Sequence, residues 1–258
     1  MFSFQSHARD GSVEPIVDGL AVWLTHHPRG LLMFTQSVLV ALREETEALS
    51  TVLRTLDAAQ FDQPTNCPPW DLRELVVHTA ASVGIRTPFP SADAQSVPSS
   101  AADYYRRPER STSEYRQSNV DLTRQLARQL PADTSPAQWF DEVTQDALTK
   151  LSHDDLNRIV LISRRGAMKL ADYVLTRVVS LAAHGLDVAL TLGRPSWTTP
   201  AAMTVIRPVF VELMGAEPPA SLNWDDQALL ATATGRRALT AEEQERLGPL
   251  RERIPVLS

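Results

Sequence analysis

The sequence predicts an all-α protein, and three observations support this prediction. Only 10 of the 258 residues are glycine, which suits helices better than a turn-rich sheet protein. Apolar residues recur at intervals of three and four along much of the chain, which is the period of one helix face. Several of these stretches also begin after a capping residue and stop at glycine or proline, as helices do.

The N-terminal half is expected to contain four helices. Their ranges are about residues 13–25, 31–56, 70–85 and 111–130. A turn with prolines at positions 64, 68 and 69 separates the second helix from the third, because proline cannot continue a helix. Residues 87–110 are rich in Pro, Ser, Ala and Asp, and we expect them to form a long loop that acts as a lid over a pocket.

The C-terminal half shows clearer helix limits. A helix over residues 135–151 opens on the cap Ser135, with proline at its first position and glutamine three residues after the cap. A long helix follows over residues 170–192, and Gly193 ends it. Between the two, the β-branched residues 159–162 are expected to form an extended segment or a small hairpin.

The remaining residues are expected to form three more helices. The first opens at Thr199, and we expect it to kink at Pro208 and to end at Gly215. A second covers residues 224–234, and a capping box that begins at Thr240 opens a short final one.

Composition excludes several classes of function. The net charge of −6 argues against a nucleic-acid-binding protein, which would need a clustered basic face. The single cysteine, Cys67, allows no internal disulfide and indicates a reducing compartment. No apolar run reaches the roughly 18 residues of a membrane span, and the start lacks an apolar signal core. We therefore expect a cytoplasmic protein, a monomer or homodimer, that binds a small molecule and neither nucleic acid nor membrane.

Two of the six histidines lie in the middle of expected apolar helices. These are His78 and His184, and either one alone would most often be a hydrogen-bonded core residue. As a pair on different helices of a bundle, they can converge on a metal in its interior. Residues four apart share a helix face, so a metal-binding helix would want a carboxylate or imidazole four positions before His184. Ser180 stands there instead.

Two stretches resemble the mycothiol-dependent maleylpyruvate isomerase family. Residues 56–78 read LDAAQFDQPTNCPPW and then DLRELVVH, and residues 170–187 contain LADY, TRVV and HGLD in the family's order. The resemblance implies a DinB-like four-helix bundle over residues 31–194. An N-terminal extension with a short helix would cover residues 1–30, and a C-terminal helical extension, residues 195–258, would pack on the bundle.

The resemblance also implies a ligand set. In this family one histidine of the second helix and a Glu-x-x-x-His pair of the fourth hold a divalent metal. His78 and His184 match the two histidines, whereas Ser180 replaces the glutamate. A serine hydroxyl is a neutral and poor ligand for a zinc-like ion, and catalytic zinc sites usually keep three protein ligands. Asp187 or Glu74 would have to substitute, although the resemblance gives Asp187 a structural or supporting role.

Other candidate residues have two interpretations each. Arg177 lies on the helix of His184 and is expected either to act on a substrate anion or to pair with Asp172 or Asp146. Cys67 is either a reactive thiol near a helix start or a packing residue of its turn. The residues expected to contact the substrate are Ser180, Tyr104 and Trp70.

Three functions follow from these features. The first is a metal- and mycothiol-dependent isomerase or S-transferase acting on a small electrophilic metabolite, in which the metal lowers the pKa of the thiol. The second is a metal-free enzyme for an isomerisation or cyclisation in a specialised biosynthetic pathway, with His78, His184 and Arg177 as its catalytic groups. The third is a non-catalytic ligand-binding protein that keeps only the fold.

Overall fold

The computed structural model describes residues 28–84, 89–93, 95–162 and 166–257. The chain divides into two compact units, Met1–Phe34 and Thr35–Ser258. The helix predicted at residues 13–25, and with it His7, His26 and His27, lies outside the described residues.

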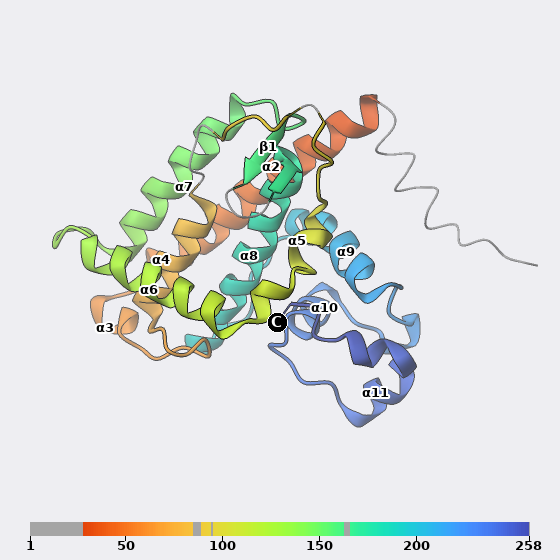
Figure 1. The fold of residues 1–258 in the computed structure, drawn as a ribbon. Coiled ribbons are helices and arrows are strands. Elements are labelled where there is room, and N and C mark those ends of the chain that lie inside the picture. The colour runs from red at the N-terminus through yellow and green to blue at the C-terminus, as the bar shows by residue number, and fades with distance from the viewer. Residues whose placement is uncertain (1–27, 85–88, 94, 163–165, 258) are drawn as a thin grey trace, which may run out of the picture. The chain divides into compact units, whose positions relative to one another are not determined.

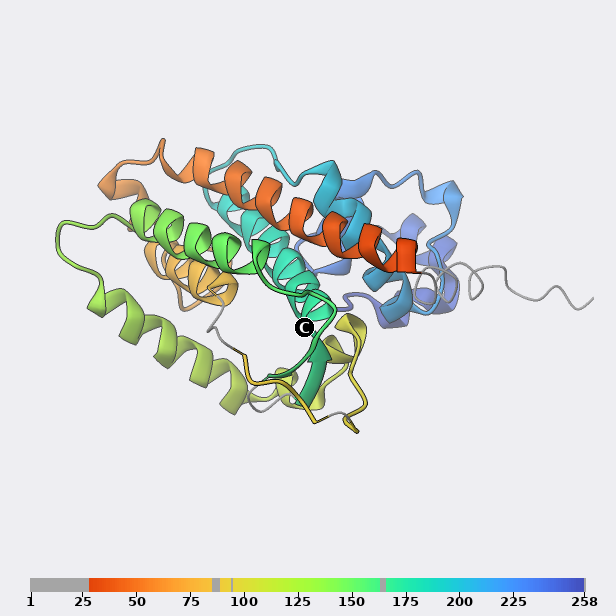
Figure 2. The ribbon, with the colours of Figure 1, turned by 90° about the horizontal axis from the view of Figure 1, so that it is seen from above.

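Four long helices form the predicted bundle. They are α2 (Pro28–Leu53), α4 (Leu72–Val83), α7 (Pro136–Ser152) and α8 (Leu170–Thr191). Helix α4 packs against both α7 and α8. Helix α2 lies beside α7 (Figures 1 and 2), where Ser50 and Arg54 donate hydrogen bonds to Asp141. The all-α prediction and the DinB-like four-helix bundle are therefore confirmed.

Helix α8 is the core helix of this bundle. Its side chains are buried on nearly every face, as is expected of a helix surrounded by other elements. By length and composition it would pass for a membrane span, but 78% of its most apolar stretch is buried inside the protein. Its apolar character therefore reflects packing against α4, α9 (Pro200–Met214) and α10 (Asp226–Ala233).

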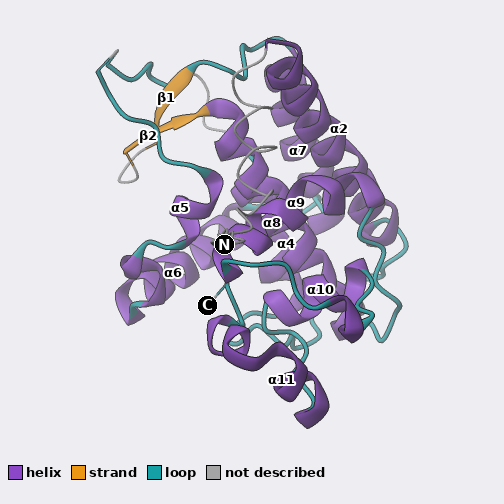
Figure 3. Cartoon of the chain, turned by 90° about the vertical axis from the view of Figure 1, so that its right-hand side faces the viewer, coloured by secondary structure: helices purple, strands orange, loops and turns teal. Residues whose placement is uncertain are grey.

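A short hairpin and the segment before α6 (Ser113–Gln129) cover one end of the bundle. Strands β1 (Ile159–Ile162) and β2 (Gly166–Lys169) pair antiparallel, which confirms the predicted hairpin. The chain meets this hairpin at Pro90 and again at Ser99, because Leu161 N–H donates to the Pro90 carbonyl and Ser99 N–H to that of Ala167. Helix α5 (Ala101–Tyr105) follows directly (Figure 3).

The prediction of a continuous loop over residues 87–110 is therefore wrong in part. Helix α5 and a 3₁₀ turn, η1 (Pro108–Ser111), interrupt it. The cause is local, since Ser100 and Asp103 form a capping box at the start of α5. One more short helix, α3 (Ala58–Phe61), lies in the turn before α4.

The C-terminal residues pack on the bundle within the same unit. Helix α9 contacts α8 and α5, and α10 contacts α8. The kink expected at Pro208 does not interrupt α9, which runs through that proline and ends before Gly215 in the left-handed conformation. The remaining elements are η2 (Ala220–Leu222), α11 (Ala241–Leu247) and η3 (Gly248–Arg253).

Candidate active site

A cavity of about 770 Å³ opens between α4, α5, α6, α8 and the hairpin. Its lining includes His78 and Ser82 from α4, and Arg177, Ser180 and His184 from α8. Tyr104 and Arg110 line it from the segment before α6, and Arg236 from the chain after α10. Four of these residues on α4 and α8 were singled out in the sequence. The structure brings His78 on α4 to the same cavity as Arg177, Ser180 and His184 on α8.

His78 is held between an indole ring and a hydroxyl. Trp70 packs on the imidazole with ring centroids 4.3 Å apart, and Nδ1 lies 3.1 Å from the Thr123 hydroxyl on α6. Burial, followed by the nearby charges of His184 and Arg177, holds the pKa of His78 well below its usual value. The ring is therefore neutral at pH 7, with Nε2 as the nitrogen left for the cavity.

His184 is oriented by a buried carboxylate. Asp187, one turn further along α8, accepts a hydrogen bond from His184 Nδ1 at 3.0 Å. Burial alone would raise the pKa of Asp187, but hydrogen bonds from His184 and Arg236 lower it well below its ordinary value. Because an ionised carboxylate can only accept, His184 carries its proton on Nδ1 and directs Nε2 to the cavity.

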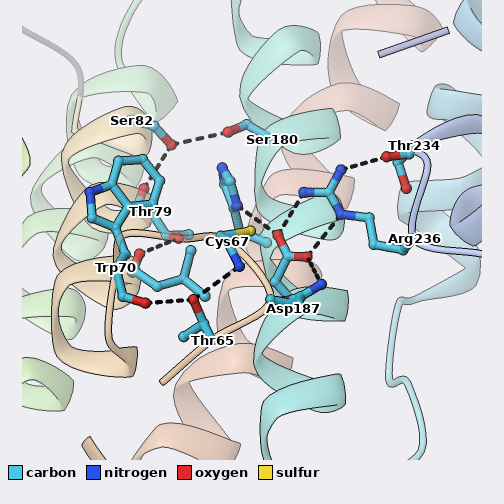
Figure 4. A network of polar contacts seen from close by, with 12 residues as sticks. Thr65, Cys67, Trp70, Thr79, Ser82, Ser180, Asp187, Thr234 and Arg236 are labelled. Carbon is cyan, nitrogen blue, oxygen red and sulfur yellow. Dashed lines mark hydrogen bonds and ion pairs between the residues drawn. The ribbon is translucent and has the colours of Figure 1, made fainter. Parts of the chain in front are cut away.

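Arg236 completes this arrangement from the C-terminal part of the chain (Figure 4). Its Nη2 and Nε donate to the two oxygens of Asp187 at 2.6 and 2.9 Å, and its Nη1 donates to the Thr234 carbonyl. The Asn66 amide adds a hydrogen bond to Asp187 at 2.9 Å. Each oxygen of the Asp187 carboxylate thus accepts two hydrogen bonds.

Comparison with known proteins identifies the family. The profile of the mycothiol maleylpyruvate isomerase N-terminal domain matches residues 42–189, more than half of the chain. The chain belongs to this family. No curated protein and no solved structure matches the sequence. The match contains both histidines and Asp187, whereas Arg236 lies beyond it.

Ser180 on α8 and Ser82 on α4 form a pair of hydroxyls at the cavity. Ser180 Oγ lies 3.4 Å from Ser82 Oγ, and Ser82 donates to the Thr79 carbonyl on its own helix (Figure 4). The rings of His78 and His184 lie nearly perpendicular, with centroids 5.1 Å apart. The two imidazoles are therefore neighbours, and on the Ser180 side of them the hydrogen bond between the helices joins two neutral hydroxyls.

These donors do not fit a zinc-type catalytic site, which takes three protein ligands and an open position. Ser180 offers only a neutral hydroxyl. Cys67, His184 and Asp187 do place one donor atom each within 4.8 Å of one another. However, Arg236 already binds both oxygens of Asp187, and its positive charge opposes a metal ion at the same place.

The Cys67 thiol is protonated at neutral pH. Burial, and next the negative charge of Asp187, raise the pKa of Cys67 to about 12, although Arg236 acts in the opposite direction. A thiol must lose its proton to bind a metal or to act as a nucleophile. This environment favours the packing role of Cys67 over that of a reactive thiol.

The other predicted residues divide between the cavity and its surroundings. Tyr104 is buried rather than exposed in a loop, and its hydroxyl accepts from Arg177 at 2.8 Å. Trp70 and Glu74 are not among the described residues that line the cavity. Trp70 lies behind His78, and Glu74 pairs with Arg124 at 3.3 Å.

Two residues of the site, Arg236 and Arg110, carry no signal in a single sequence. Arg236 follows Asp187 by 49 positions in the chain, and no periodicity connects the two. Arg110 falls in the segment predicted as a loop. The capping box at Ser100 was the one available signal there, since it predicts a helix that would carry Tyr104.

Proposed function

We propose that the chain is a maleylpyruvate-isomerase-like enzyme that isomerises a small electrophilic metabolite by proton transfer. One observation carries the proposal: Asp187 fixes His184 with Nε2 free for a cavity that also exposes His78. A carboxylate–histidine pair of this kind sets the tautomer and orientation of a general base. The hydroxyl of Ser180 at the place of a metal ligand supports the metal-free version of the chemistry.

The proposed reaction uses the two imidazoles as base and acid. His184 Nε2 takes a proton from a substrate carbon made acidic by a neighbouring carbonyl or double bond. The same proton returns to a different carbon from the His184 imidazolium, either directly or after transfer to the neutral ring of His78, so both rings end in their starting state. The double bond shifts between the two positions and no further reactant is consumed. Asp187 stabilises the positive charge that forms on His184 during the transfer.

A second candidate is the mycothiol-dependent isomerase or S-transferase that the family name indicates. The close grouping of Cys67, His184 and Asp187 is the observation that favours it. A divalent metal there would act as a Lewis acid and lower the pKa of a bound thiol. It would first have to displace Arg236 from Asp187.

The deciding experiment measures metal content and activity together. Wild type and Ser180→Glu are purified without chelators, their metals are quantified by mass spectrometry, and both are assayed on maleylpyruvate with and without mycothiol and EDTA. We expect a metal-poor wild type whose activity EDTA does not change, and a metal-loaded Ser180→Glu variant. Near-stoichiometric zinc or a similar ion in wild type, with activity lost in EDTA, would support the second candidate instead.

Histidine variants test the roles of the two rings. We expect His184→Asn and His78→Asn each to lower turnover by about 10²- to 10⁴-fold, the usual size of general acid–base catalysis. The matched control is His153→Asn, because His153 is exposed at the end of α7. Unchanged turnover in both active-site variants, with intact folding, would exclude the two imidazoles as the acid and base. An intact wild type without any turnover would leave a non-catalytic binding protein as the better description.

A further inference from the structure

Arg177 is a buried cation that pairs with no carboxylate among the described residues. Its side chain is buried in the core helix, with only 6% of the residue exposed. Its hydrogen-bond partners are all neutral: the Tyr104 hydroxyl, the Thr176 hydroxyl and the Ser82 carbonyl. The alternative partners weighed above are engaged elsewhere, since Asp172 accepts from Ala101 N–H and Asp146 pairs with Lys150. Among the described residues no carboxylate lies within ion-pair distance of Arg177.

Arg110 places a second unpaired cation at the same end of the cavity. Its guanidinium lies over the rings of Tyr104, Tyr105 and Tyr115, at 4.9, 5.0 and 5.6 Å from their centroids. It donates one hydrogen bond, to the Tyr115 hydroxyl at 3.2 Å, and no described acid pairs with it. Arg177 stacks on the same Tyr104 ring at 5.2 Å. One tyrosine therefore contacts both guanidinium groups.

The charges that line the cavity do not balance. Three arginines and no aspartate or glutamate are among its described lining residues. Arg236 is neutralised by Asp187, which leaves Arg110 and Arg177 uncompensated. A buried unpaired charge is strongly destabilising, and cation–π contacts return only a part of that free energy. An anion bound in the cavity would pair with these arginines and recover the rest of that free energy.

We propose that Arg110 and Arg177 form a subsite for the oxyanion, carboxylate or phosphate, of an organic ligand whose apolar body extends along the cavity. The planar guanidinium fork matches either oxyanion. The apolar body is inferred from the lining, where Leu122 on α6 and Leu161 on β1 stay 43% and 42% exposed at the cavity. Aliphatic and aromatic side chains complete that wall: Phe89, Leu126, Ile162 and Val179. The identification of this ligand as the substrate rests on the proposed function.

Matched probes test the charge preference. Isothermal titration calorimetry compares trans-cinnamate with trans-cinnamamide, which have the same shape and differ in the negative charge. We expect wild type to bind the carboxylate at least about tenfold more tightly, since a charge-assisted hydrogen bond is roughly twice as strong as a neutral one. Arg110→Gln and Arg177→Gln should each bring the two affinities towards equality. Arg116→Gln, the same change at an exposed position of α6, should retain the preference.

The outcomes separate this inference from the proposed function. Equal affinity for the two probes in wild type, no binding of either, or a preference that persists in both cavity variants would overturn it. Arg110→Gln decides the matter if Arg177→Gln does not fold. Competition by inorganic phosphate would show that the subsite takes a phosphate, and its failure would restrict it to carboxylates. Because the titration needs no turnover, a protein that binds cinnamate but isomerises nothing refutes the proposed function alone.

Discussion

Asp187 is the residue on which the polar contacts of the cavity converge. It receives hydrogen bonds from His184, Asn66 and Arg236, which come from three separate parts of the chain. The contact with His184 sets the tautomer of its imidazole. The contact with Asn66 holds the turn before α4, and the contact with Arg236 holds the chain after α10. A single buried carboxylate therefore links the chemistry of the cavity to the stability of its walls.

The Cys67 thiol should react slowly with alkylating reagents. Its pKa of about 12, against an ordinary 9.0, lowers the thiolate fraction. At pH 8 this predicts alkylation by iodoacetamide about 10³-fold slower in the native protein than after unfolding in urea. Mass spectrometry of quenched samples gives both rates, and the unfolded chain is its own control because Cys67 is the only cysteine.

A native rate close to the unfolded rate would contradict this expectation. It would mean that the thiol is ionised beside Arg236, and that Cys67 is a nucleophile after all. The metal-and-thiol candidate would then gain the charged sulfur ligand that it lacks.

For single residues, the sequence predicts which side chains share one face of a helix, but not the contacts between distant segments. Helical spacing indicates that His78 and His184 face the interior, and the family resemblance indicates that they meet. The absence of a carboxylate beside Arg177 depends on where Asp172 and Asp146 point, which spacing alone leaves open. The contact between Arg236 and Asp187 joins distant segments, so no local pattern could reveal it.

Helix limits are the features best predicted at the scale of single elements. The caps of α7 and α11 form as reciprocal hydrogen bonds at Ser135 and Thr240, and α8 and α9 end next to glycines at 193 and 215. These signals are local, since a side chain satisfies backbone groups a few residues away. Helix α5 was not predicted because five residues are too few for a periodic pattern, although its capping box is present.

The two glycines that follow α8 and α9 should differ in their response to alanine. Gly193 has φ +60° with open space around it, and Gly215 has φ +82° with Arg253 beside it. A Cβ on Gly215 would lie 1.9 Å from Arg253 Nη1, which donates to the Met214 carbonyl. We expect Gly193→Ala to cost about 1 kcal/mol of unfolding free energy, for the left-handed backbone alone. Gly215→Ala should cost about 2 kcal/mol, because the Arg253 hydrogen bond is lost as well.

Urea unfolding of both variants measures the difference. In an Arg253→Ala background the cost of Gly215→Ala should fall to that of Gly193→Ala, since the side chain that obstructs the Cβ is gone. Equal costs in the original background would show that Arg253 moves aside without losing its contact.

The unit Thr35–Ser258 behaves as one structure because the C-terminal segment contributes to the bundle at two places. Arg236 reaches the cavity, and the start of α9 is bound by a residue of α2. There the backbone N–H of Thr199 donates to Glu45 Oε2 at 2.8 Å. The resemblance predicts a C-terminal extension packed on the bundle. That this extension supplies a charge to the cavity follows only from the three-dimensional arrangement.

Burial of the Glu45 carboxyl group at this contact disfavours its ionised form. The residue is 1% exposed, and its Oε1 has no hydrogen-bond partner among the described residues. Burial raises the pKa of Glu45 from 4.5 to about 7, although hydrogen bonds from Thr199 and Thr198 counteract part of the rise. Buried in this way, the carboxyl group is better accommodated with its proton than without it.

The stability of the folded protein should therefore fall as the pH rises from about 4.5 to 7. In this window the folded state holds the Glu45 proton more tightly than the unfolded state does, so raising the pH favours unfolding. The full effect amounts to roughly 3 kcal/mol at pH 8. Glu45→Gln keeps an acceptor for Thr199 N–H and carries no titrating proton. We expect this variant to match wild type near pH 5 and to exceed its unfolding free energy by a similar amount at pH 8.

The comparison needs a variant that changes the net charge equally. Glu44→Gln is suitable, because Glu44 is exposed on the same helix. Urea unfolding at pH 5, 6, 7 and 8 gives three curves, and subtracting the Glu44→Gln curve removes the contribution of net charge. Parallel curves for wild type and Glu45→Gln would mean that Glu45 stays ionised when buried, with its free oxygen satisfied by water. A gap that widens with pH would instead assign the loss of stability to the deprotonation of this one carboxyl group between α2 and α9.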